Sequence, residues 1–231
     1  MRLRVQAAAA FPLEGTDWRR KVILGGATGL LLELLFVGLA YLASEEAAFG
    51  IAPIVVVLNF PVLGYVLRVY RGTLRWEMGG LPDWMDWPGL LRAGLIGFGI
   101  LAAYGMLPLL LLLLGLGLLV QGGILLFLGM VLMVLGVLAG LITLFFFPMA
   151  LARYLTQSRL EAAFHLGRVW DGINTVLTEY MAAYLLSVAS YILGGIAAAI
   201  PYLGPTVWPF LWFYLFLVQA HLFGEICSKA S

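Results

Sequence analysis

Residues 95–147 read LIGFGILAAYGMLPLLLLLLGLGLLVQGGILLFLGMVLMVLGVLAGLITLFFF and carry no Asp, Glu, Lys or Arg. About 20 apolar residues in a helix cross the hydrocarbon core of a bilayer. The stretch is therefore long enough for two crossings, with LGLLVQG at 116–122 as the turn between them. It predicts a helical hairpin in a membrane, with spans over 95–115 and 123–147.

The rest of the chain has the same composition. Hydrophobic residues make up 63% of the 231 residues and charged residues 11%, whereas soluble domains average about 45–50% and about 25%. We predict an all-α polytopic integral membrane protein, with residues 1–231 forming a single transmembrane domain. Six segments reach the spanning length: 22–43, 50–70, 95–115, 123–147, 177–200 and 205–226.

The positive charges alternate with pairs of predicted spans. The predicted outer turns at 44–49, 116–122 and 201–204 contain no Lys or Arg. Positive residues favour the cytoplasmic side, so we expect both termini in the cytoplasm and the protein in the cell membrane. The thirteen Lys and Arg residues are Arg2, Arg4, Arg19, Arg20, Lys21, Arg68, Arg71, Arg75, Arg92, Arg153, Arg159, Arg168 and Lys229.

Charge and cysteine content exclude other classes. A net charge of +1 gives no support for a nucleic-acid partner. Basic residues beside spans instead suit anionic lipid headgroups. Cys227 is the only cysteine, so no intrachain disulfide forms.

Three inner segments, 10–21, 72–94 and 149–176, combine Trp and Leu with charges. Indole rings prefer the headgroup level, so we expect amphipathic helices on the inner membrane surface. Asp86, which precedes Trp87 and Pro88, is predicted to cap a helix N-terminus.

These segments also suggest a weak repeat of three helical hairpins, each opened by an inner Trp-Asp pair. The pairs are Asp17-Trp18, Asp86-Trp87 and Trp170-Asp171. The first two return spans share a Phe-Pro, at Phe60-Pro61 and Phe147-Pro148, and the third does not. The pattern predicts a parallel repeat about the membrane normal.

Two stretches carry a family resemblance: AFPLEGTDWRRKVILGG at 10–26 and FPVLGYVLRVYRGTLRWEMGGLPDWMDWPGLLRAGL at 60–95. With Gly64-Tyr65 and a Leu-Pro-x-Trp-x-Asp-Trp loop, the chain resembles the prokaryotic family called domain of unknown function 4013. The resemblance implies a polytopic membrane protein and no particular reaction. The loop motif consists of Leu81, Pro82, Asp83, Trp84, Asp86 and Trp87.

Glu33 lies near the middle of the first predicted span, in LLLELLFVG. A charge at mid-bilayer costs about 2.5–3.5 kcal/mol on insertion scales. Counted from the inner membrane boundary, Asn59 is about as deep in the second predicted span as Glu33 is in the first. The two side chains are therefore expected to meet at one depth. Two interpretations stay open: a polar site for a solute or ion, or a protonated Glu33 tied to Asn59 between helices.

A second candidate cluster lies at the predicted inner ends of the last two spans. His221 and Glu225 are four residues apart on one helix face. Zinc needs three or four ligands, and His165 is the only other histidine, so no metal site is predicted. We expect a headgroup-level network with Arg153 or Arg168. The cluster consists of Glu179, Gln219, His221 and Glu225.

Two functions remain from the sequence, and no enzyme or cofactor signature is present. The first is a non-enzymatic scaffold or accessory subunit that packs against another membrane protein, or against a second copy of the chain. The alternative is a small-solute or lipid transporter with its polar site at Glu33 and Asn59. The few polar groups in the predicted spans favour the scaffold, because transporters of polar solutes line a cavity at the midplane.

Overall fold

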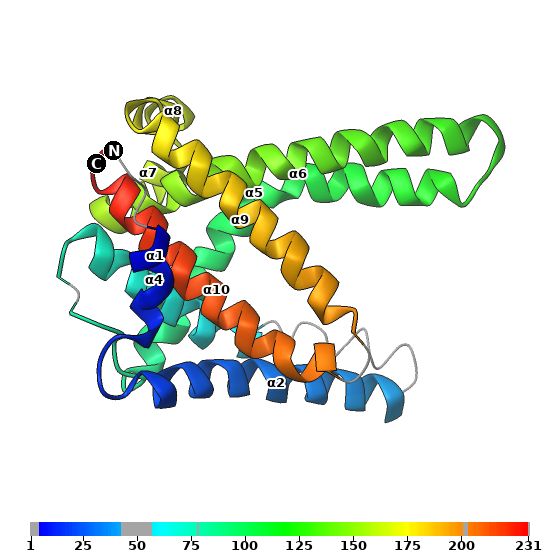
Figure 1. The fold of residues 1–231 in the computed structure, drawn as a ribbon. Coiled ribbons are helices and arrows are strands. Elements are labelled where there is room, and N and C mark those ends of the chain that lie inside the picture. The colour runs from blue at the N-terminus through cyan, green and yellow to red at the C-terminus, as the bar shows by residue number, and fades with distance from the viewer. Residues whose placement is uncertain (1–4, 43–56, 78, 201–202, 231) are drawn as a thin grey trace. The chain divides into compact units, whose positions relative to one another are not determined.

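The computed structural model describes residues 5–42, 57–77, 79–200 and 203–230. These residues form helices and connecting turns, with no strand among them. Figure 1 shows the elements in chain order. They are α1 (Val5–Ala10), η1 (Phe11–Leu13), α2 (Trp18–Leu42), α4 (Phe60–Leu74), α5 (Trp87–Leu119), α6 (Gly123–Gln157), α7 (Leu160–Phe164), α8 (Leu166–Thr175), α9 (Leu177–Ala198) and α10 (Leu203–Cys227).

Four of the described helices are long and apolar enough to cross a membrane: α5, α6, α9 and residues Thr206–Cys227 of α10. They correspond to the last four predicted spans, which confirms the membrane class. The first predicted span, 22–43, falls within α2 as far as Leu42. Residues 50–56 of the second lie outside the described residues. The count of six spans and the three-hairpin repeat stay predictions.

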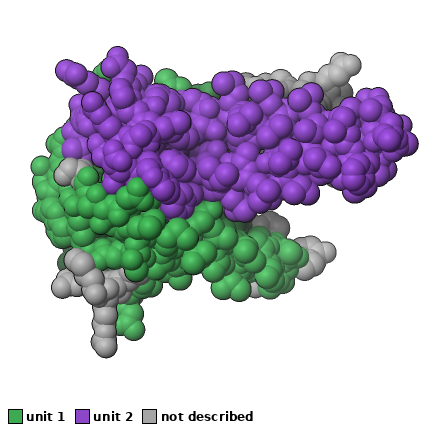
Figure 2. Space-filling model, turned by 90° about the horizontal axis from the view of Figure 1, so that it is seen from above, with its two compact units in different colours: residues 1–97, 172–231 green, residues 98–171 purple. Residues whose placement is uncertain are grey.

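The described chain divides into two compact units, shown in different colours in Figure 2. Unit 1 comprises residues 1–97 and 172–231, and unit 2 comprises residues 98–171.

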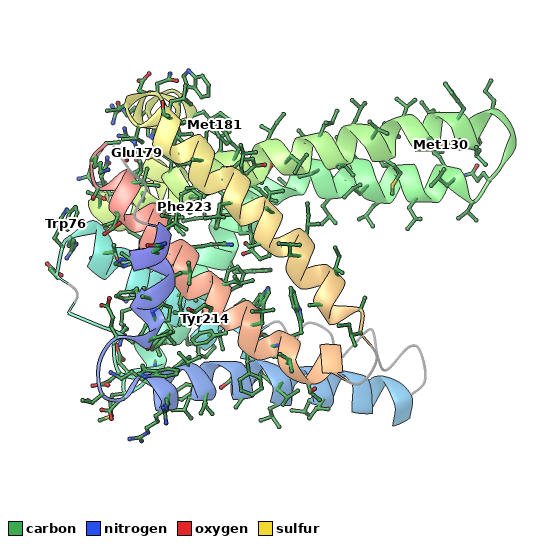
Figure 3. The ribbon with its side chains drawn as sticks, in the orientation of Figure 1. Trp76, Met130, Glu179, Met181, Tyr214 and Phe223 are labelled. Carbon is green, nitrogen blue, oxygen red and sulfur yellow. The ribbon has the colours of Figure 1, made fainter. Side chains whose placement is uncertain are left out.

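In unit 1, α10 is the central helix. It packs against α2, α4 and α9, and it also contacts α1 and η1. Small residues bring these helices close: a Cβ at Gly25 would overlap the ring of Phe213, and one at Gly224 would lie 2.7 Å from the side chain of Thr73. Tyr214 of α10 donates a hydrogen bond to the carbonyl of Ala9, which ties α1 to α10 (Figure 3).

Unit 2 is dominated by an antiparallel hairpin of α5 and α6 (Figure 1). The helices approach closely at Gly115 and Gly129, where an added Cβ would lie within 3.0 Å of the opposite backbone. The turn is shorter than predicted, because α5 continues to Leu119. Gly122 and Gly123, with φ of 72° and 60°, make the reversal.

The inner segments differ from the predicted surface helices. Within 72–94, α4 continues to Leu74 and α5 begins at Trp87, and the described residues between them, 75–77 and 79–86, form a loop. Within 149–176, α6 extends to Gln157 and only the short α7 and α8 follow. The physical reason for the loop is that its side chains are bound by the helices of unit 1, as described next.

Candidate functional site

Trp84 is the centre of the 81–87 loop. Its indole is 8% exposed and stacks on Tyr65 of α4, with ring centroids 4.0 Å apart and ring planes 10° apart. Phe213 of α10 lies 5.9 Å from the same indole. Trp84 therefore belongs to the core of unit 1, and the headgroup-level position of the loop tryptophans stays a prediction. Trp76 and Trp87 are exposed.

Hydrogen bonds from two helices hold the backbone of this loop. The Tyr65 hydroxyl donates to the carbonyl of Pro82 at 2.8 Å. The Lys21 ammonium of α2 donates to the carbonyl of Leu81 at 2.7 Å and lies 2.9 Å from the Asp83 carboxylate. In return, Trp84 Nε1 donates to the carbonyl of Lys21 at 3.2 Å. The loop thus joins the first turn of α2 to α4.

Asp86 sets the start of α5. Its Oδ1 accepts the backbone N–H of Gly89 at 3.0 Å, which confirms the predicted N-cap. Its Oδ2 lies 2.8 Å from Arg68 of α4. A Cβ at Gly64 would collide with the backbone of Leu90, so α4 and the first turns of α5 cross at close range. We refer to these contacts of Trp84, Tyr65, Lys21 and Asp86 as the loop clamp.

His221 of the second candidate cluster contacts residues from two other elements. The Thr73 hydroxyl donates its proton to the Val69 carbonyl at 3.1 Å. His221 Nδ1 lies 3.1 Å from the same Thr73 Oγ1, within hydrogen-bond distance. Phe11 stacks on the imidazole at 4.0 Å between ring centroids and 6° between planes. Glu225 Oε1 lies 3.7 Å from Nε2 on the other side.

The other two members have separate partners. Gln219 Oε1 accepts a hydrogen bond from the Tyr191 hydroxyl of α9 at 2.8 Å, and its Nε2 is buried without a partner. Glu179 pairs with Lys229. Glu179, Gln219 and the His221–Glu225 pair thus make distinct contacts, and the expected network with Arg153 or Arg168 stays a prediction. Among the described residues, no group of three His, Cys, Asp or Glu side chains could hold a metal ion.

The predicted site at Glu33 and Asn59 is placed only in part. Glu33 belongs to α2, but its side chain lies outside the described residues. Asn59 occupies the N-cap position of α4, where its side chain makes no capping hydrogen bond, and it is half-buried. Their pairing stays a prediction.

Sequence reasoning missed three side chains that organise these sites: Tyr65, Thr73 and Phe11. Tyr65 carries a usable signal, because it follows Gly64 in the stretch that carries the family resemblance. For Thr73 and Phe11 no local signal exists, since their partner His221 is about 150 and 210 residues away along the chain, and only the packing of α10 brings it to them.

Residues 48–203 match the family model described as Protein of unknown function (DUF4013), which includes most of the loop clamp. Comparison with curated proteins and with solved structures gave no match.

Proposed function

This chain belongs to the DUF4013 family, and from that premise we propose that it is a non-enzymatic scaffold or accessory subunit of a membrane complex. It lies in the cell membrane with both termini in the cytoplasm. The apolar helices make it a membrane protein. The proposal adds a partner, a second integral membrane protein that binds the tip of the α5–α6 hairpin.

The length of this hairpin carries the proposal. Residues 93–119 and 123–152 contain no Asp, Glu, Lys or Arg. As helices they measure about 40 and about 45 Å, compared with about 30 Å for a hydrocarbon core. At an average tilt of about 20°, the shorter run still spans about 38 Å along the bilayer normal. With Arg153 at one interface, the run of about 45 Å in α6 carries the tip beyond the hydrocarbon on the other side.

The tip is apolar and uncovered. Val120 is 84% exposed and Ile124 is 86% exposed, and Phe127 and Leu116 are also exposed. Gln121 is the one polar side chain between Leu116 and Phe127. Apolar side chains outside the hydrocarbon are favourable only when another apolar surface covers them. A partner membrane protein would supply that surface.

Polar groups inside the hairpin are not available to a partner, because they form hydrogen bonds within unit 2. Tyr104 donates its hydroxyl proton to the carbonyl of Ala163 at 2.5 Å, and Thr143 donates to the carbonyl of Tyr104 at 3.1 Å. The outward surface is left apolar, which suits recognition by close helix packing rather than by a polar substrate.

Site-specific photocrosslinking in cells tests the proposal. A photoreactive residue at Ile124 should give one discrete adduct that contains another membrane protein. The matched control is Leu138, which is also exposed but lies in the middle of α6; there we expect lipid adducts. Absence of a protein adduct at Ile124 contradicts the proposal, and an adduct of two copies of this chain replaces the accessory subunit with a homo-oligomer.

The transporter alternative has one observation in its favour. Gln219 holds a buried amide N–H group without an acceptor inside the candidate span of α10. A polar solute can bind there by accepting a hydrogen bond from this N–H group, which has no other partner among the described residues in the hydrocarbon region. Reconstituted protein with Glu33→Gln should then lose transport at normal membrane abundance, whereas equal loss of abundance and transport supports a structural tie to Asn59.

A further inference from the structure

The three arginines of unit 2, Arg153, Arg159 and Arg168, lack acidic partners. No ion pair to any of them occurs within the described residues. In unit 1, three of the described basic residues, Lys21, Arg68 and Lys229, each have a carboxylate oxygen within 2.9 Å. Glu161 is the only acid between Arg153 and Arg168. From Arg153 to Asp171 the stretch has three arginines and two acids, Glu161 and Asp171, so positive charge is in excess.

Arg153 is the most constrained of the three. It is the first charged residue after the uncharged run that begins at Ala93, so it marks the interface end of α6. Its Nε is buried and has no hydrogen-bond partner. A buried guanidinium N–H without an acceptor is unfavourable. The fork of an arginine matches a phosphate group, with two parallel hydrogen bonds.

The segment that carries the other two arginines is held against the hairpin. Tyr104 of α5 binds the carbonyl of Ala163 and stacks on Phe164 at 5.7 Å between ring centroids. Phe146 of α6 stacks on Trp170 at 5.9 Å. Figure 1 labels α7 and α8 at the end of the hairpin away from its tip. Arg159 and Arg168 are therefore fixed at the same end as Arg153.

The exposed apolar side chains at this end match the interface of a bilayer. Phe164, Leu166 and Trp170 are all exposed, although two of them stack on the hairpin. Aromatic rings of this kind lie at the level of lipid headgroups. The end of unit 2 thus combines cations for a phosphate with an apolar surface for the glycerol and upper acyl chain.

From this arrangement we infer that unit 2 binds the headgroup of an anionic phospholipid through Arg153 and Arg159, with Arg168 as a third positive charge. A zwitterionic headgroup would bring a cation towards these arginines, and an anionic headgroup would not. The inference is independent of the partner at the hairpin tip, because it concerns the opposite end of the hairpin.

Native mass spectrometry of the full chain, exchanged between phosphatidylglycerol and phosphatidylcholine, tests this site. The wild type should retain phosphatidylglycerol in preference. Arg153→Gln and Arg159→Gln should each reduce that retention several-fold. Arg153→Lys should be intermediate, because lysine keeps the charge and loses the fork.

The matched control is Arg92→Gln, which removes the exposed arginine at the start of the uncharged run. It should leave lipid retention unchanged. Equal retention of both lipids by the wild type overturns the site, as does an equal loss in Arg92→Gln and Arg153→Gln. Size-exclusion profiles of each variant in detergent show whether a loss comes from unfolding, and Arg159→Gln, at an exposed position, keeps the test valid if Arg153→Gln fails to fold.

Discussion

Trp84 and Tyr65 stack nearly face to face, with ring centroids 4.0 Å apart and ring planes 10° apart. The pair joins the loop between α4 and α5 to the core of unit 1. A stretch that looks like a surface segment is therefore a structural clamp, and this difference can be measured.

Trp84→Ala should destabilise the protein by about 3–5 kcal/mol, the range for removing a large aromatic side chain from a core. Trp87→Ala, at a half-exposed ring in the same loop, should cost about 1 kcal/mol or less. Thermal unfolding in detergent compares the two. If both variants lose a similar amount of stability, Trp84 contributes no more to the core than the exposed Trp87 does.

Substitutions should distinguish how much each of the two contacts of Lys21 contributes to stability. Asp83→Asn removes an exposed ion pair, which is worth about 0–1 kcal/mol. Lys21→Met also leaves the Leu81 carbonyl without its donor, and a buried acceptor without a partner costs about 1–3 kcal/mol. Chemical unfolding should therefore rank Lys21→Met well below Asp83→Asn in stability. The reverse order would mean that the ion pair dominates.

Asp86 combines a helix cap with an ion pair, and two variants distinguish them. Asp86→Asn keeps a side-chain oxygen for the Gly89 N–H and loses the charge that faces Arg68. Asp86→Ala loses both, so it should be less stable than Asp86→Asn by about 1 kcal/mol, the usual value of a cap. Equal stabilities in the melting curves would argue against a capping role.

Gly64 marks the closest approach between α4 and α5. Gly64→Ala should be strongly destabilising, because its Cβ would overlap the Leu90 backbone, which cannot move as a side-chain end can. Gly79→Ala is the matched control, since nothing lies within 4 Å of a Cβ there. Expression and monodispersity of the two variants should differ clearly; a well-folded Gly64→Ala protein would mean that the helices separate easily.

Trp76 has a backbone conformation that suits glycine. It follows the last turn of α4 with φ of 57°, and the Glu77 N–H donates to the Gly72 carbonyl at 3.0 Å, as in a Schellman motif. Its ring is 69% exposed (Figure 3). Trp76→Gly should therefore raise stability in detergent by about 1 kcal/mol.

If Trp76 anchors the loop at a membrane interface, the gain in stability of Trp76→Gly over the wild type should be smaller in lipid nanodiscs than in detergent. Melting temperatures in both media test this. A loss of stability in detergent would contradict the strain at Trp76.

The sequence predicts those features of the chain that depend on composition and on neighbouring residues. The uncharged run at 95–147 predicts a hairpin, and α5 and α6 confirm it. Asp86 before Trp87-Pro88 predicts a cap, and the Gly89 hydrogen bond confirms it. The resemblance at 60–95 predicts the family, and the match over residues 48–203 confirms it. These predictions succeed because hydropathy and capping act within one helix or one turn.

By itself, the sequence determined that this protein is helical, lies in a membrane and belongs to its family. Only the tertiary structure decided which tryptophan is buried, since Trp76, Trp84 and Trp87 occur in one stretch of similar composition. It also decided the partners of His221 and Lys21. The physical reason is that burial and hydrogen bonding depend on which helix faces meet. Those faces come together only when segments 60 or more residues apart pack against each other.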